Sequence, residues 1–190
     1  MRASDAERLL IEDVRAWHEW LAEHHQRSTG VWVVLWRPAT GHPRPSYDEL
    51  IREALCWGWI DGQSKPLDSE RSMLWFTGRK PTSVWSATNK ARVAELEAQG
   101  RLQPAGIAQI ERAKADGRWT LLESAEALIE PAELAAALDG DPSARRYWDG
   151  LTPGVRKQAL SWIAIAKRPE TRAARIAQIA TRAGQGERPV

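Results

Sequence analysis

The sequence predicts an α+β fold, with a small, mostly antiparallel sheet of at least three strands in the first half and a helical second half. Two observations place the strands: the run "VWVVLW" at 31–36, and the pair "WIDGQSK" and "RSMLWFTGR" joined by "PLDSE". The third observation is that, from Pro81 onward, prolines and caps mark one helix start after another.

The N-terminal region predicts a helix followed by a buried strand. Apolar residues recur there at steps of four, three and four: Leu10, Val14, Trp17 and Leu21. This spacing places them on one face of a helix over residues 5–25. The continuous β-branched and aromatic run at 31–36 is typical of a strand buried on both faces.

Ser46 and Glu49 form the pattern of a capping box, so a second helix is expected to begin here. Gly58 is well placed to end that helix, because a glycine after the last turn takes up the left-handed conformation readily. The segment "LCWGWIDGQSKPLD" (55–68) therefore contains a helix end followed by the start of a strand.

The second half reads as helices. Ser83 or Ser86 can cap a helix that reaches Gln99, and Pro104 starts another. Further first-turn prolines are Pro131, Pro142, Pro153 and Pro169, and Asp141 and Thr152 are expected caps. We expect a single domain over residues 1–184, with a helix and small sheet over 1–95, a helical part over 96–184 and a frayed tail at 185–190.

Charge is unevenly distributed along the 190 residues, although the formal net charge is only +2. Residues 95–141 contain ten acids and four bases, and residues 142–190 contain three acids and ten bases. Such asymmetry can mark a nucleic-acid or membrane contact. It can equally mark two parts of one domain that attract each other.

Several function classes lack support in the sequence. The single cysteine, Cys56, excludes an intrachain disulfide and is expected to be a buried, inert thiol. No motif of a common hydrolase, phosphate-binding loop or zinc site occurs, so we expect no cofactor and no metal. The acidic N-terminus and the absence of a long apolar run predict a soluble cytoplasmic protein without a membrane span.

The candidate site lies between Trp57 and Arg92. Strict alternation along a strand would place Trp59, Asp61, Gln63 and Lys65 on one face. On the next strand, Arg71, Met73, Trp75, Thr77 and Arg79 would share a side. We expect these two sets to form one face that mixes tryptophans, an acid, an amide and cations, a composition unusual for a core.

Residues 71–94 contain five bases and no acid. Two of these bases, Arg79 and Lys80, precede a helix start, where unsatisfied N–H groups suit a carboxylate or phosphate. The candidate ligand-binding residues are Trp59, Asp61, Gln63, Arg71, Arg79, Lys80, Trp85, Ser86 and Asn89. The alternative is a structural ion-pair network, in which Asp61, Asp68 or Glu70 neutralises the arginines.

Two other functions are also considered. Asp61 is the candidate general acid or base of an enzyme, since burial beside tryptophans would raise its pKa. The basic C-terminal helices could instead contact nucleic acid or a protein partner. The cations that would contact phosphates there are Arg168, Arg172, Arg175 and Arg182.

Four segments together resemble one family: "EALCWGWIDGQ", "FTGRKPTSVWSATNKARV", "PAGIAQIERAKADGRW" and "WIAIAKRPETRAARI". The chain is similar, from about Trp17 to Ile179, to the YdeI/OmpD-associated proteins, also called bacteriocin-protection proteins. The family's Gly-Trp-Ile-Asp-Gly run falls on Gly58 to Gly62, and its Ala-Lys-Arg-Pro-Glu-Thr-Arg run falls on Ala166 to Arg172.

Two more family runs can be placed on the sequence. One falls on Phe76 to Pro81, with Gly78 in place of the expected proline; the other falls on Trp85, Ser86, Asn89 and Lys90. The resemblance implies a role in resistance to bacteriocins or cationic antimicrobial peptides. Combined with the candidate residues, it predicts a cytoplasmic stress or antimicrobial-protection protein that binds a small anionic or polar ligand.

Overall fold

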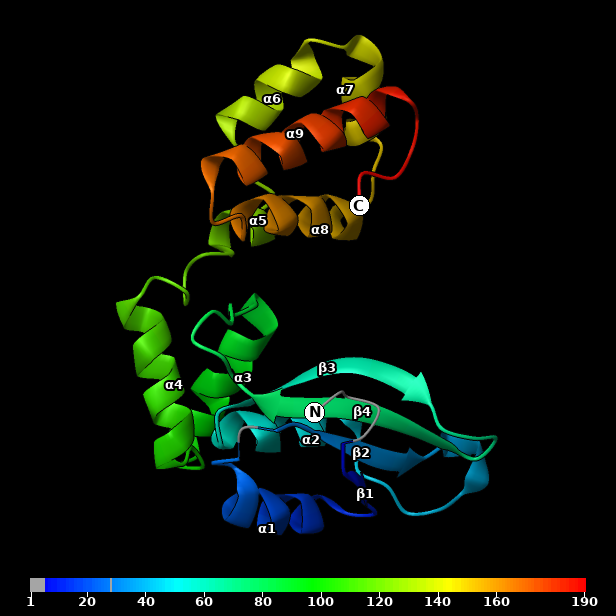
Figure 1. The fold of residues 1–190 in the computed structure, drawn as a ribbon, viewed down its shortest axis with the longest axis vertical. Coiled ribbons are helices and arrows are strands. Elements are labelled where there is room, and N and C mark those ends of the chain that lie inside the picture. Colours follow the sequence, from blue (N-terminus) through cyan, green and yellow to red (C-terminus); the bar gives the residue numbers. More distant parts are fainter. Residues whose placement is uncertain (1–5, 28) are drawn as a thin grey trace. The chain divides into compact units, whose positions relative to one another are not determined.

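The computed structural model describes residues 6–27 and 29–190, and these divide into two compact units. The first unit contains the described residues up to Ser83 together with Thr88–Asp116. The second contains Val84–Ala87 and Gly117–Val190. Each unit is described by itself; both appear as ribbons in Figure 1.

The first unit is built on a four-stranded sheet with the strand order β1-β2-β4-β3. Its strands are β1 (Arg8–Leu10), β2 (Val31–Trp36), β3 (Trp59–Pro66) and β4 (Arg71–Gly78). Strand β4 pairs antiparallel with both β2 and β3, whereas β1 pairs parallel to β2. The α+β class and the early, mostly antiparallel sheet are therefore confirmed, and the parallel pair makes the sheet mixed.

Helix α1 (Val14–His24) begins much later than predicted. The prediction over 5–25 is wrong before Val14, and residue 5 lies outside the described residues. Asp13 caps the helix by accepting a hydrogen bond from the Ala16 backbone N–H at 2.8 Å. Leu10, assigned to the helix by its spacing, belongs instead to β1, whose backbone bonds to β2 override the local periodicity.

Helix α2 (Tyr47–Cys56) follows a 3₁₀ turn, η2 (Pro38–Thr40), and starts at the predicted capping box. The Glu49 N–H donates to the Ser46 hydroxyl at 3.2 Å, and the Ser46 N–H donates to the Glu49 carboxylate at 2.7 Å. Gly58 follows the helix with φ +74°, as expected for a left-handed stop.

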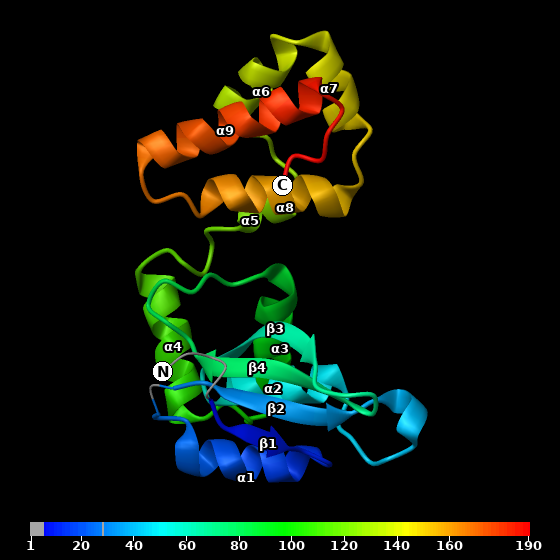
Figure 2. The ribbon, with the colours of Figure 1, turned by 45° about the vertical axis from the view of Figure 1, so that its right-hand side comes forward.

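The core of the first unit lies between the sheet and the helices α1 and α2, which Figure 2 shows beside it. Trp17 of α1 is fully buried, its ring centroid 5.1 Å from that of Phe76 and 6.5 Å from that of Trp59. Its indole N–H donates to the carbonyl of Leu50 in α2. One tryptophan thus joins both helices to the inner face of the sheet.

A register shift in β3 changes which residues share a face. Trp59 pairs with Gly78 and Asp61 with Phe76, on the inner face, but pairing is irregular between Asp61 and Ser64. After this shift Lys65 pairs with Met73 on the opposite face. Because Trp59 and Asp61 pair with Gly78 and Phe76, they lie on the opposite face from Met73, Trp75 and Thr77, so the predicted single mixed face is wrong. The irregularity after Asp61 then reverses the alternation within β3, since it inserts extra backbone.

Two helices complete the first unit: α3 (Ala87–Ala98), which starts in the short segment assigned to the second unit, and α4 (Pro104–Ala115). Helix α4 packs closely on the end of α2, where the Gln103 N–H donates to the Cys56 carbonyl at 3.0 Å. A Cβ atom on Gly106 would lie 2.3 Å from that same oxygen. The missing side chain of Gly106 allows this approach.

The second unit is helical, as predicted. Its helices are α5 (Glu123–Glu126), α6 (Ala132–Asp139), α7 (Pro142–Asp149), α8 (Pro153–Ala164) and α9 (Pro169–Gly184). The prolines at 142, 153 and 169 occupy the first turn as expected, whereas Pro131 is the N-cap of α6. Asp141 caps α7 through its side chain, while Thr152 precedes α8 without a side-chain hydrogen bond.

Ion pairs in the second unit join its acidic and basic segments. Arg145 contacts Glu130 at 3.0 Å and Asp139 at 2.8 Å. Lys157 contacts Glu126 at 3.2 Å. These pairs favour the interpretation that the uneven charge reflects attraction within the protein.

None of the helices in the described part of the chain combines the length and hydropathy that a membrane span requires. Within the same residues, no three histidine, cysteine or acidic side chains gather closely enough to hold a metal ion.

Candidate functional site

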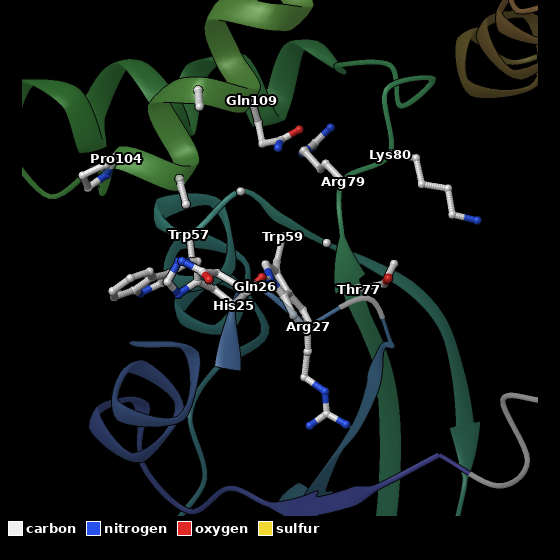
Figure 3. A pocket seen from close by; sticks show the side chains of 14 residues that line it. His25, Gln26, Arg27, Trp57, Trp59, Thr77, Arg79, Lys80, Pro104 and Gln109 are labelled. Atoms are coloured by element: carbon white, nitrogen blue, oxygen red, sulfur yellow. Dashed lines mark hydrogen bonds between the residues drawn. The ribbon is translucent and has the colours of Figure 1, made fainter. Parts of the chain in front are cut away.

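A cavity of about 610 Å³ lies within the first unit (Figure 3). Four separate segments bound it: the end of α1 with the loop after it, the α2–β3 turn, the end of β4 and the start of α4. The lining residues are His25, Gln26, Arg27, Trp57, Gly58, Trp59, Thr77, Gly78, Arg79, Lys80, Pro104, Ala105, Ala108 and Gln109. Its size is that of a typical small-molecule site.

The turn at Gly58 brings these segments together. The Gly58 carbonyl accepts a hydrogen bond from the Arg79 N–H at 2.9 Å, which joins the start of β3 to the end of β4. A Cβ atom at Gly58 would lie 2.7 Å from Gln109 and 3.0 Å from the Ala105 carbonyl. Glycine is thus required here twice, for its positive φ and for the close approach of α4.

Trp59 forms a rigid wall. Its indole N–H donates to the carbonyl of His25 at 2.9 Å, and its ring meets Trp17 and Trp20 edge to face. Only 1% of the residue is exposed. Because its ring is held by neighbours, Trp59 shapes the cavity and ties the loop after α1 to β3, but it does not offer an open stacking face.

Trp57 is held by a buried carboxylate, Glu53, which was not among the predicted site residues. The Trp57 indole N–H donates to Glu53 at 3.2 Å. Glu53, only 4% exposed, also contacts His18 at 2.7 Å and Arg101 at 3.0 Å. The ring of His25 packs against the Trp57 indole. A buried carboxylate with three partners fixes one wall of the cavity.

The two histidines at the end of α1 contact carbonyls of its last turns. The Nδ1 atoms of His24 and His25 lie 2.9 and 3.1 Å from the carbonyls of Trp20 and Leu21. These contacts place both rings against helix carbonyls, where a partial positive charge is favourable.

The charged groups that line the cavity are cations. Arg79 is only 6% exposed, and burial lowers its pKa to about 10, against an opposing effect of the negative charge on Asp61. Lys80 is exposed, and Arg27 pairs with Glu7 at 2.6 Å while its guanidinium lies over the Trp20 ring. No aspartate or glutamate occurs among the described lining residues.

Figure 3 distinguishes the three cations by orientation. The Arg79 side chain extends toward Gln109 of α4, whereas Lys80 and Arg27 extend in other directions. Gln109 also accepts a hydrogen bond from Arg112. Arg79 is therefore a buried cation directed toward α4 (Figure 3), whereas Lys80 is exposed to solvent.

Three of the predicted site residues line this cavity: Trp59, Arg79 and Lys80. Asp61 lies outside the lining and accepts a hydrogen bond from the Tyr47 hydroxyl at 2.6 Å. Burial of this phenol and its bond to Asp61 raise the pKa of Tyr47 to about 12. Tyr47 is thus a stable donor at neutral pH, and Asp61 an acceptor engaged by it.

The remaining candidates lie elsewhere. Gln63 is exposed at the irregular part of β3, and Arg71 pairs with Asp68 at 2.6 Å, as the ion-pair alternative predicted. Asn89 accepts a hydrogen bond from Arg92 at 2.9 Å. Trp85, buried against Trp119, and Ser86 belong to the second unit.

Sequence reasoning missed the contributions of the loop after α1 and of α4. Gln26 and Arg27 follow a helix end, and Pro104 to Gln109 begin a helix 25 residues after Arg79. The only available signal was Gly58, whose predicted turn marked a place where backbone segments could approach closely.

An α+β protein with a cation-lined cavity beside its sheet is the class that these features define. The chain belongs to the family described as Domain of unknown function (DUF8412), whose model matches residues 9–109, more than half of its length. Residues 127–186 match a second family model, described as Bacteriocin-protection, YdeI or OmpD-Associated. No curated protein and no solved structure matches the chain.

The second match confirms the family resemblance drawn from the sequence for residues 127–186, a smaller part of the chain than the predicted span from Trp17 to Ile179. Among its motifs, "WIAIAKRPETRAARI" lies within the matched range 127–186. The segments "EALCWGWIDGQ" and "FTGRKPTSVWSATNKARV" lie instead within residues 9–109. The cavity lining, from His25 to Gln109, falls inside the first match as a whole.

Proposed function

We propose that the first unit binds a small anionic ligand in the cavity between β4 and α4. The observation that carries this proposal is the lining itself, which includes Arg27, Arg79 and Lys80 and, among the described residues, no acid. A concave site with one sign of charge concentrates ligands of the opposite sign.

The buried guanidinium of Arg79 is the central element of the proposed site. A guanidinium with little water around it carries an unfavourable solvation energy, as its lowered pKa indicates. An anion would offset this energy and accept a charge-assisted hydrogen bond. Neutral polar groups from Thr77 and Gln109 are placed to bind the rest of a polar ligand.

The biological role proposed for this binding is protection against antimicrobial stress in the cytoplasm. Support for the protection role comes from the match of residues 127–186 to the bacteriocin-protection family. Support for a reducing compartment comes from the single cysteine, which is buried. Catalysis by Asp61 is not part of the proposal, because its carboxylate is engaged by Tyr47 outside the cavity lining.

The first test compares two exposed lysines of the same unit. Lys80 lines the cavity, whereas Lys65 lies over the Trp32 ring on the opposite face of the sheet. Isothermal titration calorimetry with inorganic phosphate and with citrate should show binding to the unmodified chain. Lys80→Gln should weaken it about three- to fivefold, the effect of one exposed charge, and Lys65→Gln should leave it unchanged.

Arg79→Gln gives the stronger version of the same test and should reduce binding about tenfold or more, because a charged hydrogen bond is lost in a desolvated place. The proposal fails if neither anion binds the unmodified chain. It also fails if Lys65→Gln and Lys80→Gln weaken binding equally, since the effect would then be nonspecific charge attraction.

A further inference from the structure

The second unit contains a different cavity, of about 320 Å³, between α5, the loop 127–131 and α8. Its walls are mainly aliphatic, and the buried side chains of Leu160 and Ile163 form its base. Ile129 stands at its edge with 59% of the residue exposed. An apolar cavity of this size with a few polar groups at its edge is the usual form of a small-molecule site.

Two charged residues occur among the described residues that line this cavity, and they differ in how closely they are paired. Glu130 accepts a hydrogen bond from the Trp148 indole at 2.7 Å and pairs with Arg145 at 3.0 Å, so its charge is compensated. Arg172 has a looser contact, at 3.3 Å, with Glu133, whose side chain is 64% exposed. The charge that remains accessible to a ligand is therefore the positive charge of Arg172.

The backbone of the loop supports a binding role. Leu128 has φ +58°, a conformation that residues with a side chain adopt at a cost. It directly precedes Ile129 and Glu130, which line the cavity, and the Ile129 N–H donates to the Ser124 carbonyl at 2.8 Å. Backbone strain of this kind is concentrated at functional loops.

Arg172 also ends the run "AKRPETR" (166–172), which the sequence singled out and the proposed anion site does not use. The run forms the loop before α9 and its first turn, and this placement brings the Arg172 side chain to the edge of the cavity. Arg172 also lines a second cavity, of about 310 Å³, together with the exposed Ala173 and Ala177.

We propose that this cavity binds an amphiphilic carboxylate with a short alkyl tail. The carboxylate pairs with Arg172, and the tail lies against Leu160 and Ile163 in the cavity of about 320 Å³. The guanidinium fork matches a carboxylate in geometry and charge, and the buried aliphatic walls match the tail. This site is independent of the anion cavity in the first unit.

The experiment uses the full chain and octanoate below its micelle concentration, measured by isothermal titration calorimetry. Octanoate should bind, whereas acetate, which lacks the tail, and octanol, which lacks the charge, should bind at least tenfold more weakly. Arg172→Gln should reduce octanoate affinity about tenfold, as expected for a lost charge-assisted pair. Arg182→Gln is the matched control, since Arg182 lies on the same helix, pairs with Glu187 and lines neither cavity.

Three further variants locate the tail and the head group. Ala164→Leu fills the cavity beside Leu160 and Ile163 and should abolish binding, whereas Ala177→Leu, in the second cavity, should leave it intact. Glu133→Gln removes the intrachain partner of Arg172 and should raise octanoate affinity about two- to fivefold. The proposal is overturned if octanoate does not bind, if Ala164→Leu binds it normally, or if Arg172→Gln and Arg182→Gln behave alike.

Discussion

The surroundings of the positive charges differ between the second unit and the larger cavity of the first unit. In the second unit, Arg145 contacts three carboxylates, and Lys157 and Arg182 each contact one. In the first unit, the described lining of the larger cavity brings cations together without an acid. Four bases of residues 142–190 thus pair with acids of residues 95–141, namely Arg145, Arg156, Lys157 and Arg172. Two bases of the shorter acid-free stretch 71–94, Arg79 and Lys80, line the cavity of the first unit. The number of charges in a stretch of sequence therefore does not tell whether its cations pair with acids or line a cavity.

The largest effect is expected from a variant that displaces α4, one wall of the larger cavity, without changing any charge. Gly106→Ala would place a Cβ atom 2.3 Å from the Cys56 carbonyl and 2.8 Å from that of Leu55, so α4 must shift. We expect a loss of about 3 kcal/mol in the free energy of unfolding, measured by urea denaturation, and weaker phosphate binding.

Gly154→Ala is the control for this variant, because a Cβ atom there meets nothing within 4 Å. It should be neutral or raise stability by about 0.5 kcal/mol, as a glycine in a helix is replaced by a better helix former. Equal stability of the two variants would show that α4 does not depend on its close approach to α2.

The second prediction concerns a structural cation. Arg145→Gln leaves Glu130, whose side chain is only 18% exposed, without its closest cationic partner. The expected loss is about 2 kcal/mol, between the values for exposed and for buried pairs. Thermal denaturation at two salt concentrations measures it, and phosphate affinity should remain unchanged. A change in phosphate affinity would mean that the two units do not separate these roles.

The third prediction uses pH to sharpen the same comparison. Burial holds the pKa of Arg79 at about 10, below its ordinary value, so the side chain loses its charge as pH rises through about 10. Phosphate affinity should therefore fall across this range in the unmodified chain and in Lys80→Gln. The part of this fall due to Arg79 should be absent in Arg79→Gln. An equal fall in Arg79→Gln and in the unmodified chain would contradict the assignment.

The titration of Arg79 affects folding stability with the opposite sign to its effect on phosphate affinity. Because the folded-state pKa of Arg79 is depressed to about 10, below its unfolded value, the unfolded chain binds the proton more tightly over the pH range above about 10. The contribution of Arg79 to stability therefore becomes more favourable as pH rises through this window, while its contribution to anion binding declines.

Local signals in the sequence predicted local structure well. The capping box at Ser46, the stop at Gly58 and the paired strands after it are confirmed, because each depends on residues close together in the chain. Strand β1 was missed because three residues carry too little periodicity, and their conformation is set by bonds to β2.

The candidate site was predicted only in part for the same reason. Trp59, Arg79 and Lys80 lie in the segments that the sequence singled out. The alternation rule failed after Asp61 because an inserted residue does not show in a pattern of single letters. The α4 wall depends on the close approach at Gly106, a tertiary contact that no local spacing encodes.

The reactivity of the buried cysteine at the end of α2 provides a measure of local opening at the α2–α4 contact. Burial raises the pKa of the Cys56 thiol to about 11, and the backbone of Gly106 lies directly over the Cys56 carbonyl. The thiol can react with a labelling reagent only when this junction opens and water reaches it. Because the chain has one cysteine, the labelling rate measures how often α4 separates from the end of α2. A bound anion that holds α4 in place should slow the labelling.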